Sequence, residues 1–295
     1  MPFADVLGQD QPIGQLREAL RRDRGSVSTL FVGPVGVGRR TLMQAFAEAL
    51  LCPGGGDDAC GACPSCRAFA HGNHPDLYEL EREKERISVE EMREFCRQAG
   101  FRPMQSARRV CLVPDADRMT DQAANCFLKT LEEPPGATVL LLRSESTDRL
   151  LGTIVSRCRI VRLAPLPQAV VAATLRDRAA VDGDVAEALA TVAEGSLGRA
   201  LALAHTRPGD ALPLADELLE RAGREGGDTA RLRAGAEALL DMLALALRRQ
   251  LRDAALPRAG LRRLDAVWAA AERLQKNVSP DAVLRTLALD LVHAD

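Results

Sequence analysis

Lysine is almost absent from this chain of 295 residues, because only Lys84, Lys129 and Lys276 occur among its 39 basic residues. Aromatic residues are also few, at 3%, and neither sign of charge dominates, since 41 acidic residues leave a net charge of −2. This balance gives no reason to expect a strong nucleic-acid binder. Any contact with DNA must therefore be local or shared with partners.

Long apolar runs are missing too. No stretch is long enough to span a bilayer, and residues 1–8 lack the basic region followed by an apolar run that marks a secretory signal. We therefore expect a cytoplasmic protein with no membrane contact. In a reducing compartment its eight cysteines are not a disulfide framework.

What is present is the composition of a soluble globular protein, with 46% hydrophobic and 27% charged residues. From about residue 28 to 163, short apolar runs alternate with helical patterns, which predicts a parallel α/β sheet covered on both faces. The expected strands are 29–32, 76–80, 110–113 and 138–142, and the expected helices are 41–51, 88–100 and 121–131.

The length predicts more than one domain. Beyond Pro165 the strand signal ends, and the sequence becomes helical in pattern and rich in alanine, leucine and arginine. A break at Pro208-Gly209 divides this part in two. We expect an α/β domain over 1–165, a small helical domain over 166–207 and an all-α domain over 208–295.

Residues 33–41, GPVGVGRRT, follow a predicted strand and precede a predicted helix, which is the context of a phosphate-binding P-loop. Glycines let backbone N–H groups turn inward around phosphates. The next two positions should be lysine and a serine or threonine that holds magnesium, but they are Arg39 and Arg40. Arg40 cannot ligate a metal, and Thr41 stands one residue late. The candidate residues of this degenerate loop are Gly33, Gly36, Gly38, Arg39 and Thr41.

A second nucleotide motif also departs from the active pattern. The strand at 109–113 ends in Pro114-Asp115, where an ATPase would carry an acidic pair. If Asp115 takes the place of the water-activating acid, Pro114 takes the place of the aspartate that holds magnesium. The alternative is a shift of one residue that makes Asp115 the metal ligand. Because both motifs lack a magnesium ligand, we predict that this chain does not hydrolyse ATP.

Four of the eight cysteines are clustered, at Cys52, Cys60, Cys63 and Cys66. Four thiolates in a short loop that contains glycine suit tetrahedral zinc and leave no coordination position open, which predicts a structural zinc site. A redox pair and an iron–sulfur cluster are the alternatives. The nearby His71 and His74 are not needed as ligands.

Taken together, these segments resemble the clamp-loader subunits of the AAA+ class, most closely the delta prime subunits of bacterial DNA polymerase III. The resemblance covers about residues 1–165, and the helical remainder matches only in character. Its two most specific segments are LKTLEEPP at 128–135 and Ser156-Arg157-Cys158. Residues 3–9, FADVLGQ, are similar to the box on the adenine side of the nucleotide site, and the phosphate loop and cysteine cluster complete the match.

The resemblance implies an AAA+ α/β core with a zinc module, a three-helix lid and a helical collar that assembles a five-subunit ring. Delta prime subunits have a degenerate nucleotide site and act as a stator, whereas the relatives that hydrolyse ATP keep Lys-Thr and Asp-Glu pairs that this chain lacks. The implied partners are ATPase subunits of the gamma/tau type and a delta subunit. The sliding clamp and primer–template DNA are reached through the complex.

Within this family the Ser-Arg-Cys motif acts in trans as an arginine finger. The guanidinium of Arg157 would stabilise charge on ATP bound by a neighbouring subunit, an effect of about 10³ to 10⁵ in rate in other NTPases. A plain surface arginine is the ordinary alternative. Two other functions stay open: an autonomous ATP-hydrolysing motor, in which Arg39 replaces the lysine and Thr41 captures the metal, and a zinc-dependent nucleic-acid-binding module.

Overall fold

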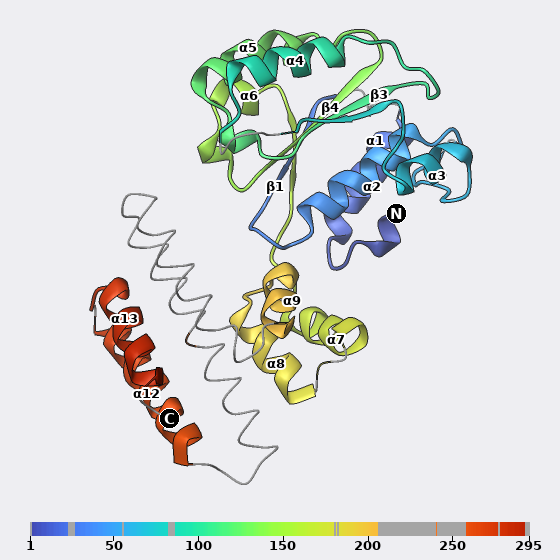
Figure 1. The fold of residues 1–295 in the computed structure, drawn as a ribbon. Helices are drawn as coiled ribbons and strands as arrows, with labels where there is room; N and C mark the ends of the chain where they lie inside the picture. Colours follow the sequence, from blue (N-terminus) through green and yellow to red (C-terminus); the bar gives the residue numbers. More distant parts are fainter. Residues whose placement is uncertain are drawn as a thin grey trace. The chain divides into compact units, whose positions relative to one another are not determined.

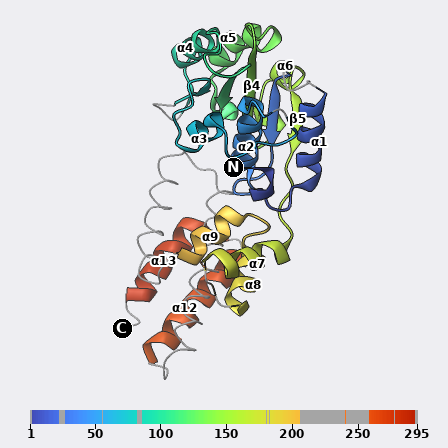
Figure 2. The same ribbon diagram turned by 90° about the vertical axis from the view of Figure 1, so that its right-hand side faces the viewer.

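The computed structural model describes residues 2–22, 27–54, 56–81, 86–179, 181, 183–205, 240, 258–276 and 278–292. It divides into two compact units, which are unit 1 (Met1–Val170 and Glu194–Gly198) and unit 2 (Val171–Ala193 and Arg199–Asp295) (Figure 1, Figure 2). The predicted break at Pro208-Gly209 and most of the predicted collar before residue 258 lie outside the described residues. Among the helices that are described, none has the length and apolar character to cross a membrane.

Unit 1 is built on a parallel sheet of five strands, in the order β2-β3-β4-β1-β5. The strands are β1 (Thr29–Val32), β2 (Leu77–Glu79), β3 (Arg109–Val113), β4 (Thr138–Ser144) and β5 (Arg159–Arg162). The predicted parallel α/β sheet and its first four strands are confirmed. No apolar run predicts β5, because only Ile160 and Val161 lie between its two arginines.

Helices cover both faces of this sheet (Figure 1). One face carries α1 (Asp10–Arg21), α2 (Arg39–Leu51) and α3 (Pro64–Ala70), and the other carries α4 (Val89–Ala99), α5 (Asp121–Glu132) and α6 (Gly152–Val155). Each face buries its own apolar cluster. Phe31 and Phe46 lie in the first cluster, and Phe95 and Phe127 lie in the second. The sheet is therefore the middle one of three layers.

The starts of two helices show how local sequence sets these elements. Helix α4 begins with a capping box, in which the amide of Glu91 donates to Ser88 Oγ and the amide of Ser88 donates to Glu91 Oε2. Helix α2 begins at Arg39, two residues before its predicted start, because Gly38 is its N-cap.

Unit 2 is helical throughout its described residues. It contains most of α7 (Gln168–Ala179), α8 (Gly183–Val192), most of α9 (Leu197–His205), α12 (Arg258–Gln275) and α13 (Pro280–Val292). Helices α12 and α13 pack against each other. The predicted helical character beyond residue 165 is thus confirmed for the described part of the chain.

Candidate functional site

The phosphate loop lies where the sequence predicts it, between the end of β1 and the start of α2. Gly36 and Gly38 have backbone φ angles of 79° and 99°, in the left-handed region that glycine adopts without strain. Since Gly38 is the N-cap, Arg39 and Arg40 are the first two residues of the helix and Thr41 is the third. The two arginines therefore lie in the turn that faces bound phosphates in a P-loop.

Contacts from distant parts of unit 1 hold this loop. A β-carbon at Gly33 would lie 2.6 Å from the carbonyl oxygen of Leu163, so position 33 needs glycine for this close approach. The buried side-chain amide of Gln9 donates to the carbonyls of Val37 and Ala164, at 3.3 and 2.8 Å. The segment that the resemblance places on the adenine side thus fixes the end of the phosphate loop.

The tip of the loop contacts the segment that returns to unit 1 from the helical part. The amide of Gly198 donates to the carbonyl of Gly36 at 3.1 Å. A β-carbon on Gly36 would lie 2.1 Å from Ser196 Oγ. A larger residue at position 36 would therefore displace the Ser196 hydroxyl, in addition to the strain of the positive φ angle.

The corner where an ATPase holds magnesium contains an arginine. Arg143, on β4, donates from Nε to the carbonyl of Pro114 and from a terminal nitrogen to the Asp115 carboxylate at 3.0 Å. Burial lowers the pKa of Arg39, and so does the neighbouring Arg143, against the opposing effect of nearby carboxylates. Two guanidinium groups thus share this corner, and one of them is bonded to the acid that would bind a metal.

No sequence motif predicts that Arg143 contacts Pro114 and Asp115. The register of β3 and β4 pairs Val113 with Leu142, so Pro114 and Arg143 follow side by side at the ends of two neighbouring strands. The available signal is a charged residue directly after a buried apolar run. Its partner could be found only by knowing that β3 and β4 are adjacent.

Arg157 lies near the amino ends of the strands, whereas the phosphate loop lies at their carboxyl ends. The parallel register of β1 and β5 pairs Thr29 with Arg159 and Val32 with Arg162. The phosphate loop follows the carboxyl end of β1, whereas Arg157 precedes the amino end of β5. At about 3.3 Å per residue, the length of the strands keeps the two apart. Arg157 is thus directed away from the chain's own nucleotide motifs.

The guanidinium of Arg157 is held by its neighbours at this end of the strands. Its Nε donates to Glu132 Oε1 at 2.7 Å, and a terminal nitrogen donates to the carbonyl of Thr153 at 2.9 Å. Glu132 is the last residue of α5 and belongs to the LKTLEEPP segment. The two segments that most specifically carry the family resemblance therefore meet at this ion pair.

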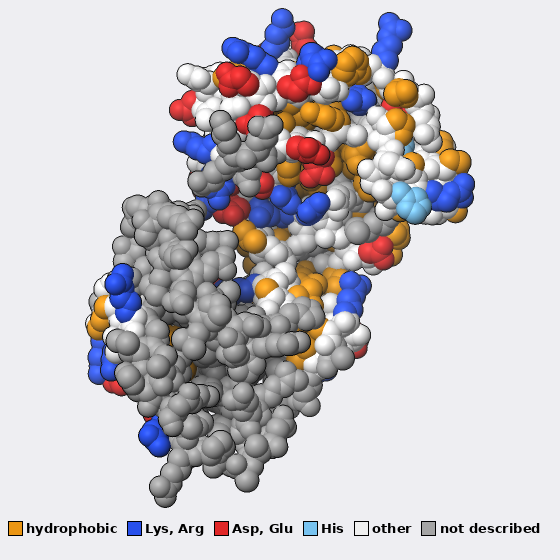
Figure 3. Space-filling model, in the orientation of Figure 1, with side chains coloured by type: hydrophobic (Ala, Val, Ile, Leu, Met, Phe, Trp, Pro, Cys, Tyr) orange, Lys and Arg blue, Asp and Glu red, His pale blue; other side chains and the backbone are white. Residues whose placement is uncertain are grey.

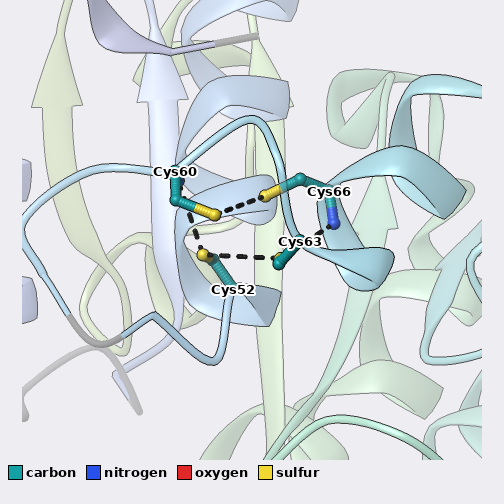
Figure 4. Close-up of side chains that lie close together, drawn as sticks. All are labelled: Cys52, Cys60, Cys63 and Cys66. Carbon is teal, nitrogen blue, oxygen red and sulfur yellow. Dashed lines mark hydrogen bonds between the residues drawn. The ribbon is translucent and has the colours of Figure 1, made fainter.

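The four cysteines of the predicted metal site come together, with their sulfurs turned toward one another (Figure 4). All four sulfurs lie within 4.8 Å of one another, with 4.0 Å between Cys52 and Cys63 and 3.9 Å between Cys60 and Cys66. Four sulfurs at about 2.3 Å from one zinc ion would be about 3.8 Å apart. The cluster therefore has nearly the size that a tetrahedral zinc site needs.

Local structure places these sulfurs. Cys52 follows the last turn of α2, Cys63 is the N-cap of α3, and Cys66 lies in the first turn of α3. Backbone N–H groups, that of Ala62 foremost, lower the pKa of Cys60 to about 6, whereas burial raises the pKa of Cys52 and Cys66. These amides thus favour the thiolate form of Cys60, which is the form of cysteine that binds metals.

Comparison with known sequences places these features in one family. The profile of the family described as DNA polymerase III, delta subunit, matches residues 8–167, which is more than half of the chain. The DNA polymerase III delta' subunits of Escherichia coli K12 and Pseudomonas aeruginosa are 37% identical over 183 residues and 41% identical over 163 residues. The chain belongs to the DNA polymerase III delta prime family.

The match to delta prime subunits covers part of each protein. The match to the Escherichia coli subunit spans 61% of this chain and 55% of that subunit. The match to the Pseudomonas aeruginosa subunit spans 54% of this chain and 49% of that subunit. The chain thus spans about half the length of the curated relatives it matches. The DNA polymerase III tau subunit of Escherichia coli is 32% identical over 207 residues, which are 68% of this chain and 32% of that subunit.

Solved structures are more distant. A DNA polymerase III gamma-subunit-related protein from Thermotoga maritima is 19% identical, with 97% of this chain and 100% of that chain covered and a TM-score of 0.45. A RuvB variant from the same organism is 15% identical, with 72% and 66% covered and a TM-score of 0.48. Likeness of this degree adds nothing to the delta prime assignment.

Beside its cysteine cluster, this delta prime family member contains a buried polar network that no motif predicts. Nδ1 of His74 accepts the amide of Asp76 at 3.1 Å, and its Nε2 lies 2.8 Å from Ser65 Oγ. Ser65 Oγ donates to the carbonyl of Leu51 at 2.8 Å. Ser65 and Leu51 each directly precede one of the four cysteines. Both ring nitrogens of His74 are thus engaged, and the residue supports the cluster without being a ligand.

Asp76→Asn is expected to lower the free energy of unfolding by about 2–3 kcal/mol, because hydrogen bonds to a charged acceptor contribute about 1.5–3 kcal/mol each. The Asp76 carboxylate is fully buried and accepts the amides of Met104, Gln105 and Ser106, at 2.5, 2.8 and 2.6 Å. Asparagine has one oxygen with which to accept them. Urea denaturation at neutral pH measures the difference.

The same substitution should change how stability depends on pH. Burial raises the pKa of Asp76, but the three amide donors and the neighbouring His74 together outweigh it and leave the pKa below its ordinary value. The stabilisation is therefore present above the ordinary pKa and is lost as the pH falls through the lower folded value. The exposed Asp177→Asn is the control. An equal loss from both substitutions at neutral pH contradicts the role of Asp76.

Proposed function

We propose that this chain is a clamp-loader subunit of bacterial DNA polymerase III that does not hydrolyse ATP and supplies Arg157 in trans to ATP bound by a neighbouring subunit. It completes a five-subunit AAA+ ring with ATPase subunits of the gamma/tau type and a delta subunit. The ring loads the sliding clamp onto primed DNA, and this chain acts in it as the stator. Clamp and primer–template DNA are reached through the complex.

The observation that carries this proposal is which residues occupy the positions where an ATPase would bind magnesium. A metal there needs oxygen ligands, but position 40 is an arginine, position 114 is a proline, and the Asp115 carboxylate is bonded to Arg143. A guanidinium cannot ligate a metal. Magnesium therefore does not fit these residues, and no hydrolytic step is routed through the chain's own phosphate loop.

The action in trans is supported by the placement of Arg157. The residue is exposed, it lies at the end of β5 away from the phosphate loop, and the described partners of its guanidinium are Glu132, Thr153 and Ser156. A guanidinium presented on an outer edge suits the charge that develops on a phosphoryl group bound by another subunit.

For the cysteine cluster we propose a structural zinc site with Cys52, Cys60, Cys63 and Cys66 as ligands. The size of the cluster, its sulfur donor set and the absence of an open position support it. The metal would fix the start of α3 to the end of α2 across the loop that connects them. Nothing in the chemistry of such a closed site gives the metal a catalytic part.

The purified chain is expected to show no magnesium-dependent ATP turnover above the background without protein, because three ligand positions are missing or occupied. Arg143→Ala should not restore turnover, since freeing Asp115 leaves positions 40 and 114 unchanged. Release of phosphate measures both. Turnover that disappears in Asp115→Asn would contradict the proposal and support the autonomous motor.

A further inference from the structure

A groove of about 1140 Å³ runs along the β2 edge of the sheet in unit 1. It opens between the helices of the two layers, with α2 and α3 on one side and α4 on the other. Small-molecule sites are roughly 300–1,000 Å³, so the volume of this groove is also sufficient for a short stretch of extended peptide. Its lining residues are Arg40, Gln44, Phe69, Gly72, Leu77, Tyr78, Glu79, Leu80, Glu81, Ser88, Glu90, Glu91, Glu94 and Leu112.

The inner part of the groove is an open strand edge. Among the described residues, β2 pairs with β3 alone. The carbonyl of Asp76 and the amide of Leu80 are bonded to β3. Backbone groups alternate in direction along a strand, so the amide and carbonyl of Glu79 point to the outer side. An extended chain could pair with them and add a sixth strand.

The chemistry of the groove selects the kind of chain. Apolar side chains form part of its surface, with Phe69 from α3 and Leu77, Tyr78 and Leu80 from the β2 strand and its end. Among the described lining residues, acidic side chains outnumber basic ones, since five are glutamates and Arg40 is the single basic residue. Figure 3 shows acidic and hydrophobic side chains together on this face of unit 1.

Two of these glutamates already have partners in the chain. Glu91 is engaged in the capping box with Ser88, and Glu94 is paired with Arg97. The charge available to a ligand is therefore mainly that of Glu79, Glu81 and Glu90, on both sides of the open edge. This placement suits a strand in which basic and apolar residues alternate, because opposite charges and apolar pairs across neighbouring strands are stabilising.

We propose that this groove binds an extended, basic segment of a partner protein, which adds to the open edge of β2 as a further strand. The backbone of Glu79 supplies the pairing, the apolar side chains receive alternate residues of the ligand, and the glutamates select arginine or lysine at the others. An anionic ligand such as a nucleic acid is disfavoured by the same charges.

The test uses the purified full chain and a fluorescent short peptide of alternating arginine and valine, with binding measured by anisotropy. We expect saturable binding that Glu79→Lys combined with Glu90→Lys weakens about tenfold or more, which corresponds to about 1.4 kcal/mol. The matched control is Glu18→Lys combined with Glu133→Lys, which changes the net charge equally at a half-buried and an exposed position outside the groove. This control should bind like the unchanged chain. Circular dichroism checks that both variants are folded.

A change in the peptide tests the strand pairing without any change in the protein. Methylating every second backbone nitrogen of the probe removes the donors of one strand edge, and the two possible sets of positions block opposite edges. One methylated peptide should lose binding and the other should keep it. Equal binding by both, equal weakening by the groove and control variants, or no saturable binding to the unchanged chain would each overturn the proposal.

Discussion

Arg157→Ala is expected to lower ATP hydrolysis at the site next to this chain by about 10³-fold or more in the reconstituted clamp loader, as in other NTPases that lose an arginine finger. The guanidinium acts on charge that develops in the transition state, so the loss should fall on the rate of hydrolysis and not on ATP affinity. Single-turnover hydrolysis measures the rate, and equilibrium binding of a nonhydrolysable ATP analogue measures the affinity.

Two further variants separate the finger from a general loss of positive charge. Arg157→Lys should stay close to the alanine variant, because an ammonium group lacks the planar fork of the guanidinium. Arg162→Ala removes an exposed arginine at the other end of β5 and should leave hydrolysis unchanged. Unchanged hydrolysis by an intact complex that carries Arg157→Ala would show that this residue has no role in trans.

The ion pair with Glu132 is compatible with that role. An exposed pair of this kind contributes about 0.2–1 kcal/mol, whereas a 10³- to 10⁵-fold effect on rate corresponds to about 4–7 kcal/mol. Arg157 can therefore exchange Glu132 for a phosphate of the neighbouring subunit at little cost. In the free chain, Glu132 and the carbonyl of Thr153 keep the guanidinium on the outer edge of the sheet.

The α/β core is predictable because its signals are local. The runs at β1, β3 and β4 are buried along nearly their whole length and stand out as apolar segments, and the capping box of Ser88 is visible in four residues. β5 is missed because two arginines frame its two apolar residues. Helix α3, which begins within the cysteine cluster, is missed because its seven residues are too few to show a helical period.

The features of the candidate site are also predictable from the sequence only where their signals are local. The cysteine spacing, the altered phosphate loop and the Ser-Arg-Cys motif are short strings that can be read directly. The His74 network depends on the packing of α3 against the end of α2. The contact of Arg143 with Asp115 and the groove along β2 depend on the order of the strands in the sheet. That order is set by tertiary packing, and one sequence contains no pattern that specifies it.

Removal of the metal is expected to lower the free energy of unfolding by about 4 kcal/mol, which is the stabilisation that a ligand gives when its free concentration exceeds Kd about a thousandfold. In a domain of this size the melting temperature should fall by about 10 °C. Cys66→Ser should have the same effect, because Cys66 is buried and a hydroxyl is a poor substitute for a thiolate on zinc. Metal analysis and thermal denaturation measure both changes.

Removal of the metal should also destabilise the segments that contact the cysteine loop before it destabilises the sheet. Asp58 lies in the loop between Cys52 and Cys60, accepts the amide of Phe3 at 3.1 Å and pairs with Arg17 at 3.2 Å. Without the metal this loop is no longer held at both ends, so the Phe3 amide should lose protection from hydrogen exchange before the sheet does. Cys126→Ser, outside the cluster, should keep one zinc and full protection. Iron in place of zinc, or a metal-free chain of unchanged stability, would contradict the structural zinc site.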